Sequence, residues 1–437
     1  MMTPAIVFAA IVCARTVTLD QAERAAEAQA PAVREARANA AAGRARTEQA
    51  RAPALPQVKL EGTYERTTGN RRQRPGRDTL VSNSWTTYNW FEGQATATQL
   101  VWDFGLTHNR WNAAEQRAVA LADTERATRL EALSAVRTAY FRARAAKELI
   151  AVAKQTLANE QRHLEQITGF VAAGSRPDID LAQARVGTAN ARVAVIRTET
   201  GYEVARAELN QAMGQVGDTD YDVTDQTLPQ VPGETGPVGS LIDEAIKARP
   251  DLAALDAEVR AQELTARAAR GGYWPRFDLI AGAVDSGIQF EKTQRIDNFG
   301  NVFPYGGMAW NVFGGVQVTW PVFQGLQTRG QVREADALIE NVRARRDGLV
   351  NEVWVAVQRA AAGVRAAHES LVAAEEALVA ARERRRLADG RYAAGVGSII
   401  ELSDAEVAAA NAGAQRVAAE YTLSAARAEL ILALGRR

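Results

Sequence analysis

Residues 102–106 read WDFGL, and residues 320–326 read WPVFQGL. Before each stretch, hydrophobic and polar residues alternate, which is the pattern of a half-exposed β-strand. After each stretch, a long segment without proline carries hydrophobic residues seven positions apart, which is the pattern of a coiled-coil helix. Each stretch therefore marks a strand that leads directly into a long helix, and its recurrence indicates that the same unit is used twice.

Other landmarks recur with nearly the same offset, about 220 residues. Pro56, which opens the first strand, matches Pro275, and the turn glycine Gly174 matches Gly395. An offset that is constant from one end of the chain to the other is typical of a tandem duplication. The sequence therefore predicts repeat 1 over residues 15–214, a linker over residues 215–239 and repeat 2 over residues 240–437.

Both repeats are predicted to contain a helix, two strands, a very long helix and a returning helix, in that order. In repeat 1 these elements are expected at residues 17–52, 57–66, 91–102, 105–173 and 177–213. In repeat 2 they are expected at residues 240–271, 276–285, 312–322, 326–394 and 399–434.

The very long helices carry heptads, for example Val350, Val357, Val364, Leu371 and Leu378. A seven-residue hydrophobic repeat imposes a left-handed supercoil on the helices that share it. At 1.5 Å per residue, a helix of about 69 residues spans about 100 Å, which is far more than a compact domain. The heptads alone are equally expected of a coiled-coil scaffold that binds partners and conducts nothing.

The strands have a different character. In the first of them, Val58 and Leu60 alternate with Lys59 and Glu61. Alternating segments of about ten residues with aromatic ends are typical of transmembrane β-strands, although a soluble sheet with one wet face gives the same alternation in any single strand. Six tryptophans flank the four strands, as in the aromatic belts at membrane interfaces: Trp85, Trp90, Trp102, Trp274, Trp310 and Trp320.

Four strands per chain are too few to close a barrel, because the smallest membrane barrels have about eight. An open sheet edge is not tolerated in lipid, because its backbone groups would lack hydrogen-bond partners there. If the sheet lies in a membrane, several copies of the chain must share one barrel. The predicted fold class is therefore an α+β membrane protein that oligomerises.

The composition excludes several classes of function. The 52 basic and 52 acidic residues give a formal charge of zero, so the basic surface of a nucleic-acid-binding protein is not expected. Cys13 is the single cysteine, which excludes a disulfide framework. His108, His163 and His368 are scattered without metal-ligand spacing, and no nucleophile–base cluster is recognisable. We therefore expect no metal, no cofactor and no enzymatic activity, that of a metal-dependent hydrolase included.

Residues 1–14 form a short apolar stretch and are predicted to be a signal segment. Whether Cys13 carries a lipid stays open, because Val12 is larger than the small residue that bacterial lipoprotein signals have in front of their cysteine. The chain contains no apolar run of about 18 residues or more, so no transmembrane helix is predicted.

In this order, the duplicated features resemble the TolC-like outer-membrane channel-tunnel family of Gram-negative bacteria, across nearly the whole chain. The resemblance rests on the strand entries at Pro56 and Pro275, the strand exits at residues 102–106 and 320–326, and the hairpin turns at residues 171–174 and 392–395. It implies a homotrimer whose three sets of four strands form a twelve-stranded outer-membrane β-barrel. An α-helical coiled-coil tunnel would continue the barrel through the periplasm, and a periplasmic adaptor protein and an inner-membrane pump would dock at the hairpin turns.

The resemblance also implies roles for four residues near the turns. Glu401 and Asp404 match acidic positions that line the closed periplasmic aperture. Three copies would give a ring of about six carboxylates, which attracts cations and repels anions. Asp180 and Tyr392 match positions that form a latch between neighbouring hairpins. For each acid the alternative is an exposed residue near a helix N-terminus, where the helix dipole favours negative charge.

The turn glycines Gly174 and Gly395 are expected to end the two very long helices at the hairpin tips. Two positions after the first glycine, Arg176 stands where the family often has a basic residue. At the equivalent place in repeat 2 the chain has Gly397 instead. The latch is therefore expected to be weaker here, or to be wired differently.

These implications describe the outer-membrane exit duct of a tripartite export system, a passive trimeric channel surrounded by outer-membrane lipid that expels small molecules. The outer-membrane component of type I protein secretion is one alternative, because the sequence does not name the cargo. A coiled-coil scaffold without a pore is another, and the alternating strands with their flanking tryptophans argue against it.

Overall fold

The computed structural model describes residues 15–68, 87–217, 220–296 and 302–437. The predicted signal segment with Cys13, and also Trp85, lie outside these described residues. None of the helices within the described ranges combines the length and the apolar character needed to cross a lipid bilayer. The described residues fall into two compact units, one from residues 15–41, 120–217, 220–256 and 344–437 and the other from residues 42–68, 87–119, 257–296 and 302–343.

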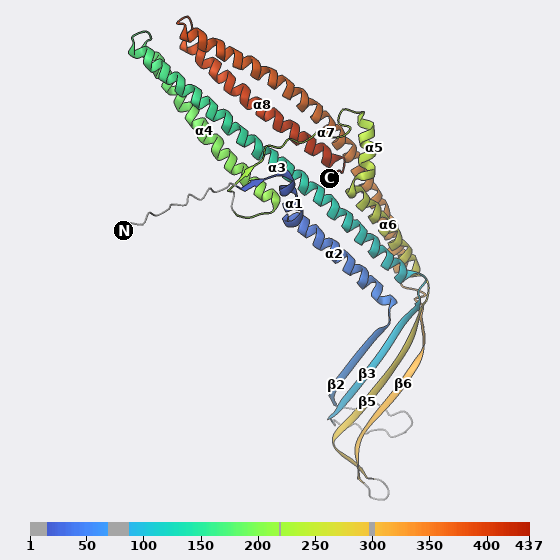
Figure 1. Ribbon diagram of the computed structural model, residues 1–437. Coiled ribbons are helices and arrows are strands. Elements are labelled where there is room, and N and C mark those ends of the chain that lie inside the picture. Colours follow the sequence, from blue (N-terminus) through green and yellow to red (C-terminus); the bar gives the residue numbers. More distant parts are fainter. Residues whose placement is uncertain (1–14, 69–86, 218–219, 297–301) are drawn as a thin grey trace, which may run out of the picture. The chain divides into compact units, whose positions relative to one another are not determined.

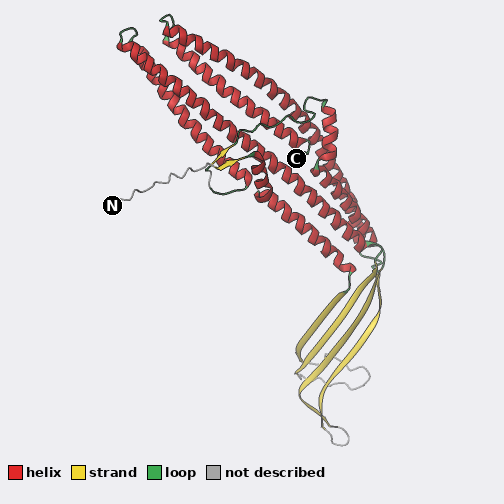
Figure 2. Ribbon diagram, in the orientation of Figure 1, coloured by secondary structure: helices red, strands yellow, loops and turns green. Residues whose placement is uncertain are grey.

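The second unit contains a sheet of four antiparallel strands that stand side by side (Figure 2). The strand order is β2-β3-β5-β6, so the central pair joins a strand of the first half of the chain to one of the second half. Among the described strands, β2 and β6 each have a neighbour on one side only. The strands are β2 Gln57–Thr68, β3 Thr87–Trp102, β5 Arg276–Ile296 and β6 Val302–Thr319.

The two strands of the second half are much longer than the alternation of their side chains predicts. β5 was expected at residues 276–285 but runs to Ile296, and β6 was expected at residues 312–322 but begins at Val302 and ends at Thr319. The strand pairing continues past the alternating segment because it depends on backbone hydrogen bonds, which need no particular side chain. The sequence pattern therefore marks only the part of each strand nearest the helices.

One face of this sheet is apolar and exposed. The register places Leu60 beside Ala95, Ala95 beside Ala283, and Ala283 beside Val312 in a single row. Leu60 is 80% exposed and Val312 is 67% exposed. Monomeric soluble proteins rarely expose a continuous apolar surface of this kind, so the face calls for an apolar environment outside the single chain.

The first unit contains the greater part of two helical hairpins, and the first residues of their long helices, 106–119 and 327–343, belong to the second unit. α4 runs back along α3, and α8 runs back along α7 (Figure 1). α3 and α7 each have 67 residues without interruption, which at 1.5 Å per residue corresponds to about 100 Å. The four helices are α3 Leu106–Ala172, α4 Asp178–Met213, α7 Gln327–Ala393 and α8 Ile399–Ala433.

The predicted helices at residues 17–52 and 240–271 are each two helices in the structure. Pro31 and Pro250 cause the breaks, because a proline disfavours the helical conformation of the residue before it. Ala30 accordingly has ψ 126° and Arg249 has ψ 123°. The resulting helices are α1 Leu19–Gln29, α2 Pro31–Arg51, α5 Val238–Ala248 and α6 Pro250–Gly271, and the 3-10 turn η1 Ala52–Ala54 follows α2.

Two short strands lie beside this helical core. β1 Arg15–Val17 pairs in parallel with β4 Tyr221–Val223, which lies in the segment predicted as a linker. The core itself contains the heptad valines: Val357 and Val364 are buried and pack in one cluster with Leu430 and Leu434 of the chain's last turns. The hydrophobic repeat of the sequence is therefore the seam along which these helices pack.

Candidate functional site at the helix-hairpin tips

Both long helices end at a glycine in the left-handed conformation. Gly174 has φ 70° and Gly395 has φ 80°. The Gly174 N–H donates to Val171 O at 2.9 Å, and the Ser175 N–H donates to Phe170 O at 3.0 Å. This is the hydrogen-bond pattern of a Schellman cap, which a residue with a Cβ atom adopts only with strain. The glycines that the sequence assigns to the turns thus end α3 and α7.

Asp180 and Tyr392 meet between the two tips. The Tyr392 hydroxyl donates to Asp180 Oδ2 at 3.0 Å, and the side chains are 3% and 6% exposed for Tyr392 and Asp180. Ile167 of α3 and Leu402 of α8 belong to the same buried cluster. Burial raises the pKa of Tyr392 to about 12, and the hydrogen bond to Asp180 and its negative charge act in the same direction. The hydroxyl is therefore a permanent donor at neutral pH.

Arg176 completes this contact. Its guanidinium donates to Tyr392 O at 2.9 Å and lies 4.4 Å from the centroid of the Tyr392 ring. The positive charge interacts favourably with the negative end of the helix dipole and with the face of the aromatic ring. The sequence marked Arg176 only as the basic residue of the first turn, and gave no sign that it crosses to the second hairpin.

Gly397 explains why the second turn has no such basic residue. A Cβ atom at this position would lie 2.9 Å from Tyr392 N, a distance that real Cβ atoms essentially never show, and 3.0 Å from Arg391 C. The turn of the second hairpin is therefore too tight for a side chain at position 397. The cation beside Tyr392 comes from Arg176 of the first hairpin instead.

The two predicted gate acids lie on the first turns of α8. The Ser398 hydroxyl caps this helix by accepting the Glu401 N–H at 3.1 Å. The Glu401 carboxylate is half-exposed and lies 3.3 Å from Arg391 Nε, while Asp404 is exposed one turn further along. Both positions are close to the tip and accessible, so their carboxylates are available to ions there.

One histidine has a contact that the sequence did not reveal. His163 of α3 lies 2.9 Å from the buried carboxylate of Glu406 in α8. The two residues are 243 positions apart, so no local spacing connects them. Among the described residues, no group of three or more His, Cys, Asp or Glu side chains could hold a metal ion.

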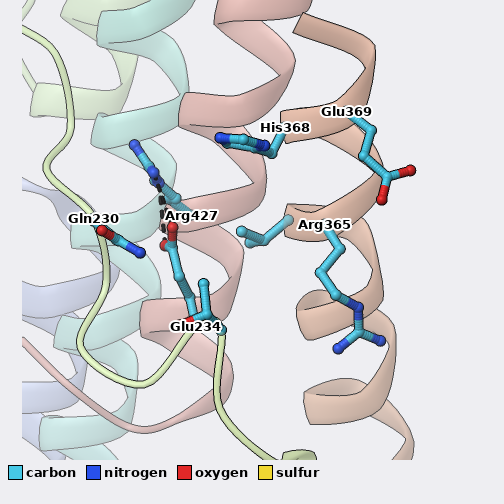
Figure 3. A pocket seen from close by; sticks show the side chains of 8 residues that line it. Gln230, Glu234, Arg365, His368, Glu369 and Arg427 are labelled. Carbon is cyan, nitrogen blue, oxygen red and sulfur yellow. Dashed lines mark hydrogen bonds and ion pairs between the residues drawn. The ribbon is translucent and has the colours of Figure 1, made fainter. Parts of the chain in front are cut away.

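A pocket of about 200 Å³ lies between the linker and the helices α7 and α8 (Figure 3). Its wall contains a bidentate ion pair, in which Arg427 donates one hydrogen bond to each carboxylate oxygen of Glu234, at 2.9 and 3.2 Å. Arg427 also donates to Leu228 O at 3.0 Å, and Glu234 accepts the Val231 N–H at 2.9 Å. These bonds satisfy the buried Glu234 carboxylate and the partly buried Arg427 guanidinium, so the pair fastens the linker to α8.

The tryptophans do not all lie where the sequence predicts. Trp102, Trp274 and Trp320 are exposed and lie at or next to the strand ends that adjoin the helices. Phe104 stacks on Trp274 with ring centroids 5.1 Å apart. Trp310 is exposed but lies inside β6, because that strand begins at Val302. Trp90 is buried, contrary to a residue facing lipid, and its indole nitrogen donates to Glu92.

The chain matches known proteins over most of its length. The family model described as outer membrane efflux protein matches it twice, at residues 23–215 and 241–436. The outer membrane protein OprJ of Pseudomonas aeruginosa is 25% identical over 353 residues, which cover 80% of this chain and 70% of OprJ. The toluene efflux pump outer membrane protein TtgI of Pseudomonas putida is 26% identical over 218 residues, which cover 49% of this chain and 45% of TtgI.

Solved structures of bacterial membrane proteins have the same fold. A membrane protein from Pseudomonas aeruginosa superposes with a TM-score of 0.77 at 22% identity, over 96% of this chain and 90% of that one. The CmeC outer membrane channel of Campylobacter jejuni gives a TM-score of 0.78 at 15% identity, over 95% of this chain and 85% of CmeC. Together with the family match, these likenesses show that the chain, a TolC-like protein of the outer membrane, belongs to the outer membrane efflux protein family.

Proposed function

We propose that this protein is the passive exit duct of a tripartite export system, which expels small molecules across the outer membrane. In this proposal three copies form one channel, and the sheets of the three copies close into a single barrel of twelve strands. The helical hairpins continue the barrel as a tunnel in the periplasm. The energy for transport comes from an inner-membrane pump, so the duct itself needs no catalytic residues.

The exposed apolar face of the sheet is the observation that carries this proposal. Leu60 is 80% exposed and Val316 is 66% exposed in a single chain. Lipid would cover that face, and strand pairing with further copies would cover the edges at β2 and β6. A coiled-coil scaffold has no use for either feature, so the sheet favours the channel over the scaffold.

The length of the helices supports the tunnel. α3 begins at Leu106, directly after the strand that ends at Trp102, and continues to the turn at Gly174. α7 follows β6 in the same way and ends at the turn of Gly395. Because the family model matches the two halves of the chain separately, we further propose that the halves arose by tandem duplication.

The hairpin tips are the proposed gate. A hydrogen bond joins Tyr392 to Asp180, and Arg176 fastens the same two tips, as a latch on a closed aperture requires. Glu401 and Asp404 carry exposed or half-exposed carboxylates beside this latch. In three copies they would form a cation-attracting ring. The adaptor and the pump would dock at these tips and open the latch.

Two relatives suggest the class of cargo. One is a toluene efflux pump outer membrane protein and another is a solvent efflux pump outer membrane protein, both from Pseudomonas putida. Small apolar molecules are therefore the proposed cargo of this duct, ahead of a secreted protein. Deleting the gene should sensitise cells to organic solvents; unchanged tolerance with loss of a secreted protein would favour type I secretion instead.

The oligomeric state tests the proposal. Native mass spectrometry of the detergent-extracted protein should give three times the mass that the same sample shows after denaturation. The protein should also need detergent to stay in solution, because of its apolar sheet face. A folded monomer that stays soluble without detergent would rule out the channel.

A further inference from the structure

We propose that His163 is a proton-controlled tie that holds the two helical hairpins of one chain together and so makes the resting closure of the channel depend on pH. The effect on channel closure rests on the function proposed above. The contact itself does not, because it is a feature of the single chain.

The tie joins three helices. His163 projects from α3, and its Nε2 lies 2.9 Å from Glu406 Oε1 of α8. Its Nδ1 lies 3.7 Å from Asp389 Oδ1 of α7 and 3.3 Å from Gln166 Oε1 of its own helix. A protonated imidazole donates from both nitrogens, to Glu406 of the second hairpin and to Gln166 of its own helix, and its positive charge also attracts Asp389 of the second hairpin. A neutral imidazole has one N–H and carries no charge, so it holds the same acceptors more weakly.

Because Glu406 is buried, the energy of its carboxylate depends on whether His163 is protonated. Glu406 is 4% exposed, and a buried carboxylate is costly unless a positive charge lies beside it. Besides His163, the positive group facing it among the described residues is Arg385 of α7, at 3.8 Å. That distance is too long for a direct hydrogen bond. His163 is therefore the closer source of positive charge, and only while it is protonated.

The carboxyl group of Glu160 increases the dependence of the contact on the protonation of His163. Glu160 lies one turn before His163, and α4 packs against it: Thr188 Oγ1 donates to Glu160 O at 3.3 Å, and a Cβ atom on Gly187 would meet the Glu160 carboxylate. Burial, and then the charge of Glu406, raise the pKa of Glu160. The cluster of Glu160, Asp389 and Glu406 thus has three carboxyl groups against Arg385 and His163, and the proton on His163 reduces their repulsion.

The direction of the pH effect follows from these contacts. The hydrogen bond to Glu406 raises the pKa of His163 above its usual 6.5; burial opposes this, and the charges of Glu406 and Asp389 add to it. A group whose pKa is higher in the folded protein stabilises the fold fully below its unfolded pKa. That stabilisation is lost as the pH rises through the higher, folded value. The tie is therefore complete below pH 6.5 and weakens toward alkaline pH.

The test compares His163→Gln with His368→Gln in the full-length protein in detergent. His368 is an exposed histidine of α7, so the second variant removes a titrating imidazole without touching the tie. The first readout is thermal unfolding followed by circular dichroism between pH 5.5 and 8.5. The wild type and His368→Gln should lose several degrees of melting temperature over this range, and His163→Gln should lose much less.

The second readout is the resting conductance in planar bilayers over the same pH range. It should rise several-fold with pH in the wild type and in His368→Gln, and stay nearly constant in His163→Gln. If His163→Gln does not fold, Glu406→Gln replaces it in the experiment. This variant removes the buried negative charge that faces His163 while keeping the shape of the side chain, so it should abolish the pH dependence of both readouts.

The two readouts separate the two proposals. Absence of current in every variant would contradict the duct, while the melting curves would still decide the tie. A wild-type pH dependence of both readouts in His163→Gln, or in Glu406→Gln where that variant replaces it, would overturn the tie and leave the duct untouched.

Discussion

Tyr392 donates a hydrogen bond to Asp180 across 3.0 Å, although 212 positions separate the two residues in the chain. One lies in the last turn of α7 and the other in the first turn of α4, so this bond connects the two hairpins where each of them reverses direction. Both side chains are buried, and water cannot easily replace the bond if it breaks. The contact is therefore the natural place to perturb the proposed gate.

Replacing Tyr392 with Phe should open the resting channel. The substitution keeps the ring but leaves the buried Asp180 carboxylate without its donor, which costs about 1–3 kcal/mol. If that cost falls on the closed state, resting conductance in planar bilayers should rise on the order of tenfold. Tyr421→Phe on α8 is the matched control and should conduct like the wild type. Equal conductance of all three proteins would remove Tyr392 from the latch.

Neutralising Glu401 and Asp404 should reduce cation selectivity. The double variant Glu401→Gln, Asp404→Asn keeps the size of both side chains and removes two charges per chain from the proposed ring. The reversal potential measured across a salt gradient should move toward zero. Asp243→Asn removes an exposed charge on α5 and serves as the control. A reversal potential that stays at the wild-type value in the double variant would show that these acids do not line the aperture.

Replacing a glycine of the second hairpin with alanine should stabilise the protein inside α7 but destabilise it at the turn that follows this helix. Gly395 has φ 80°, where a Cβ atom costs about 1–2 kcal/mol, so Gly395→Ala should lower the melting temperature. Gly390 lies five residues earlier within the helix, with open space around a Cβ atom. Gly390→Ala should raise the melting temperature, since alanine is the better helix former by about 1 kcal/mol. Shifts of the same sign would contradict the assigned cap.

The ion pair between Glu234 and Arg427 should matter more than pairs at the surface. Glu234→Gln leaves the Arg427 guanidinium, whose side chain is only 15% exposed, without its counter-charge, and breaking a buried pair costs about 3–5 kcal/mol. The loss should appear as a lower midpoint of chemical unfolding. Asp336→Asn breaks the exposed pair with Arg270 and should barely move that midpoint. Similar effects of the two substitutions would mean that the linker is not held by this contact.

The regular elements are readable from the sequence because their signals are local and repeated. The proline-free segments between the strand exits and the turn glycines predict α3 and α7 to within a residue of their ends, and the heptads along them indicate helix because every turn adds to the same pattern. The breaks at Pro31 and Pro250 were missed because hydrophobic residues continue on both sides of each proline. Strand ends in β5 and β6 were missed because backbone pairing extends beyond the alternating side chains.

The sequence predicts only part of the site at the hairpin tips. Asp180 and Tyr392 were singled out through a family resemblance, because nothing in a spacing of 212 residues indicates contact. Arg176 was noticed for its charge, but its partner lies on the other hairpin. His163 is an isolated histidine in the sequence, because its partner Glu406 lies 243 positions away in the chain. Contacts between the hairpins depend on how the helices pack, and the local pattern does not contain that information.

Ion current through the purified protein tests the proposed duct most directly. The wild-type protein, extracted in detergent and added to a planar lipid bilayer, should insert and give stepwise increases in current of uniform size. Each step would correspond to one assembled channel. Folded protein that shows its helical circular dichroism spectrum, yet gives no current above that of the bare bilayer, would contradict the account.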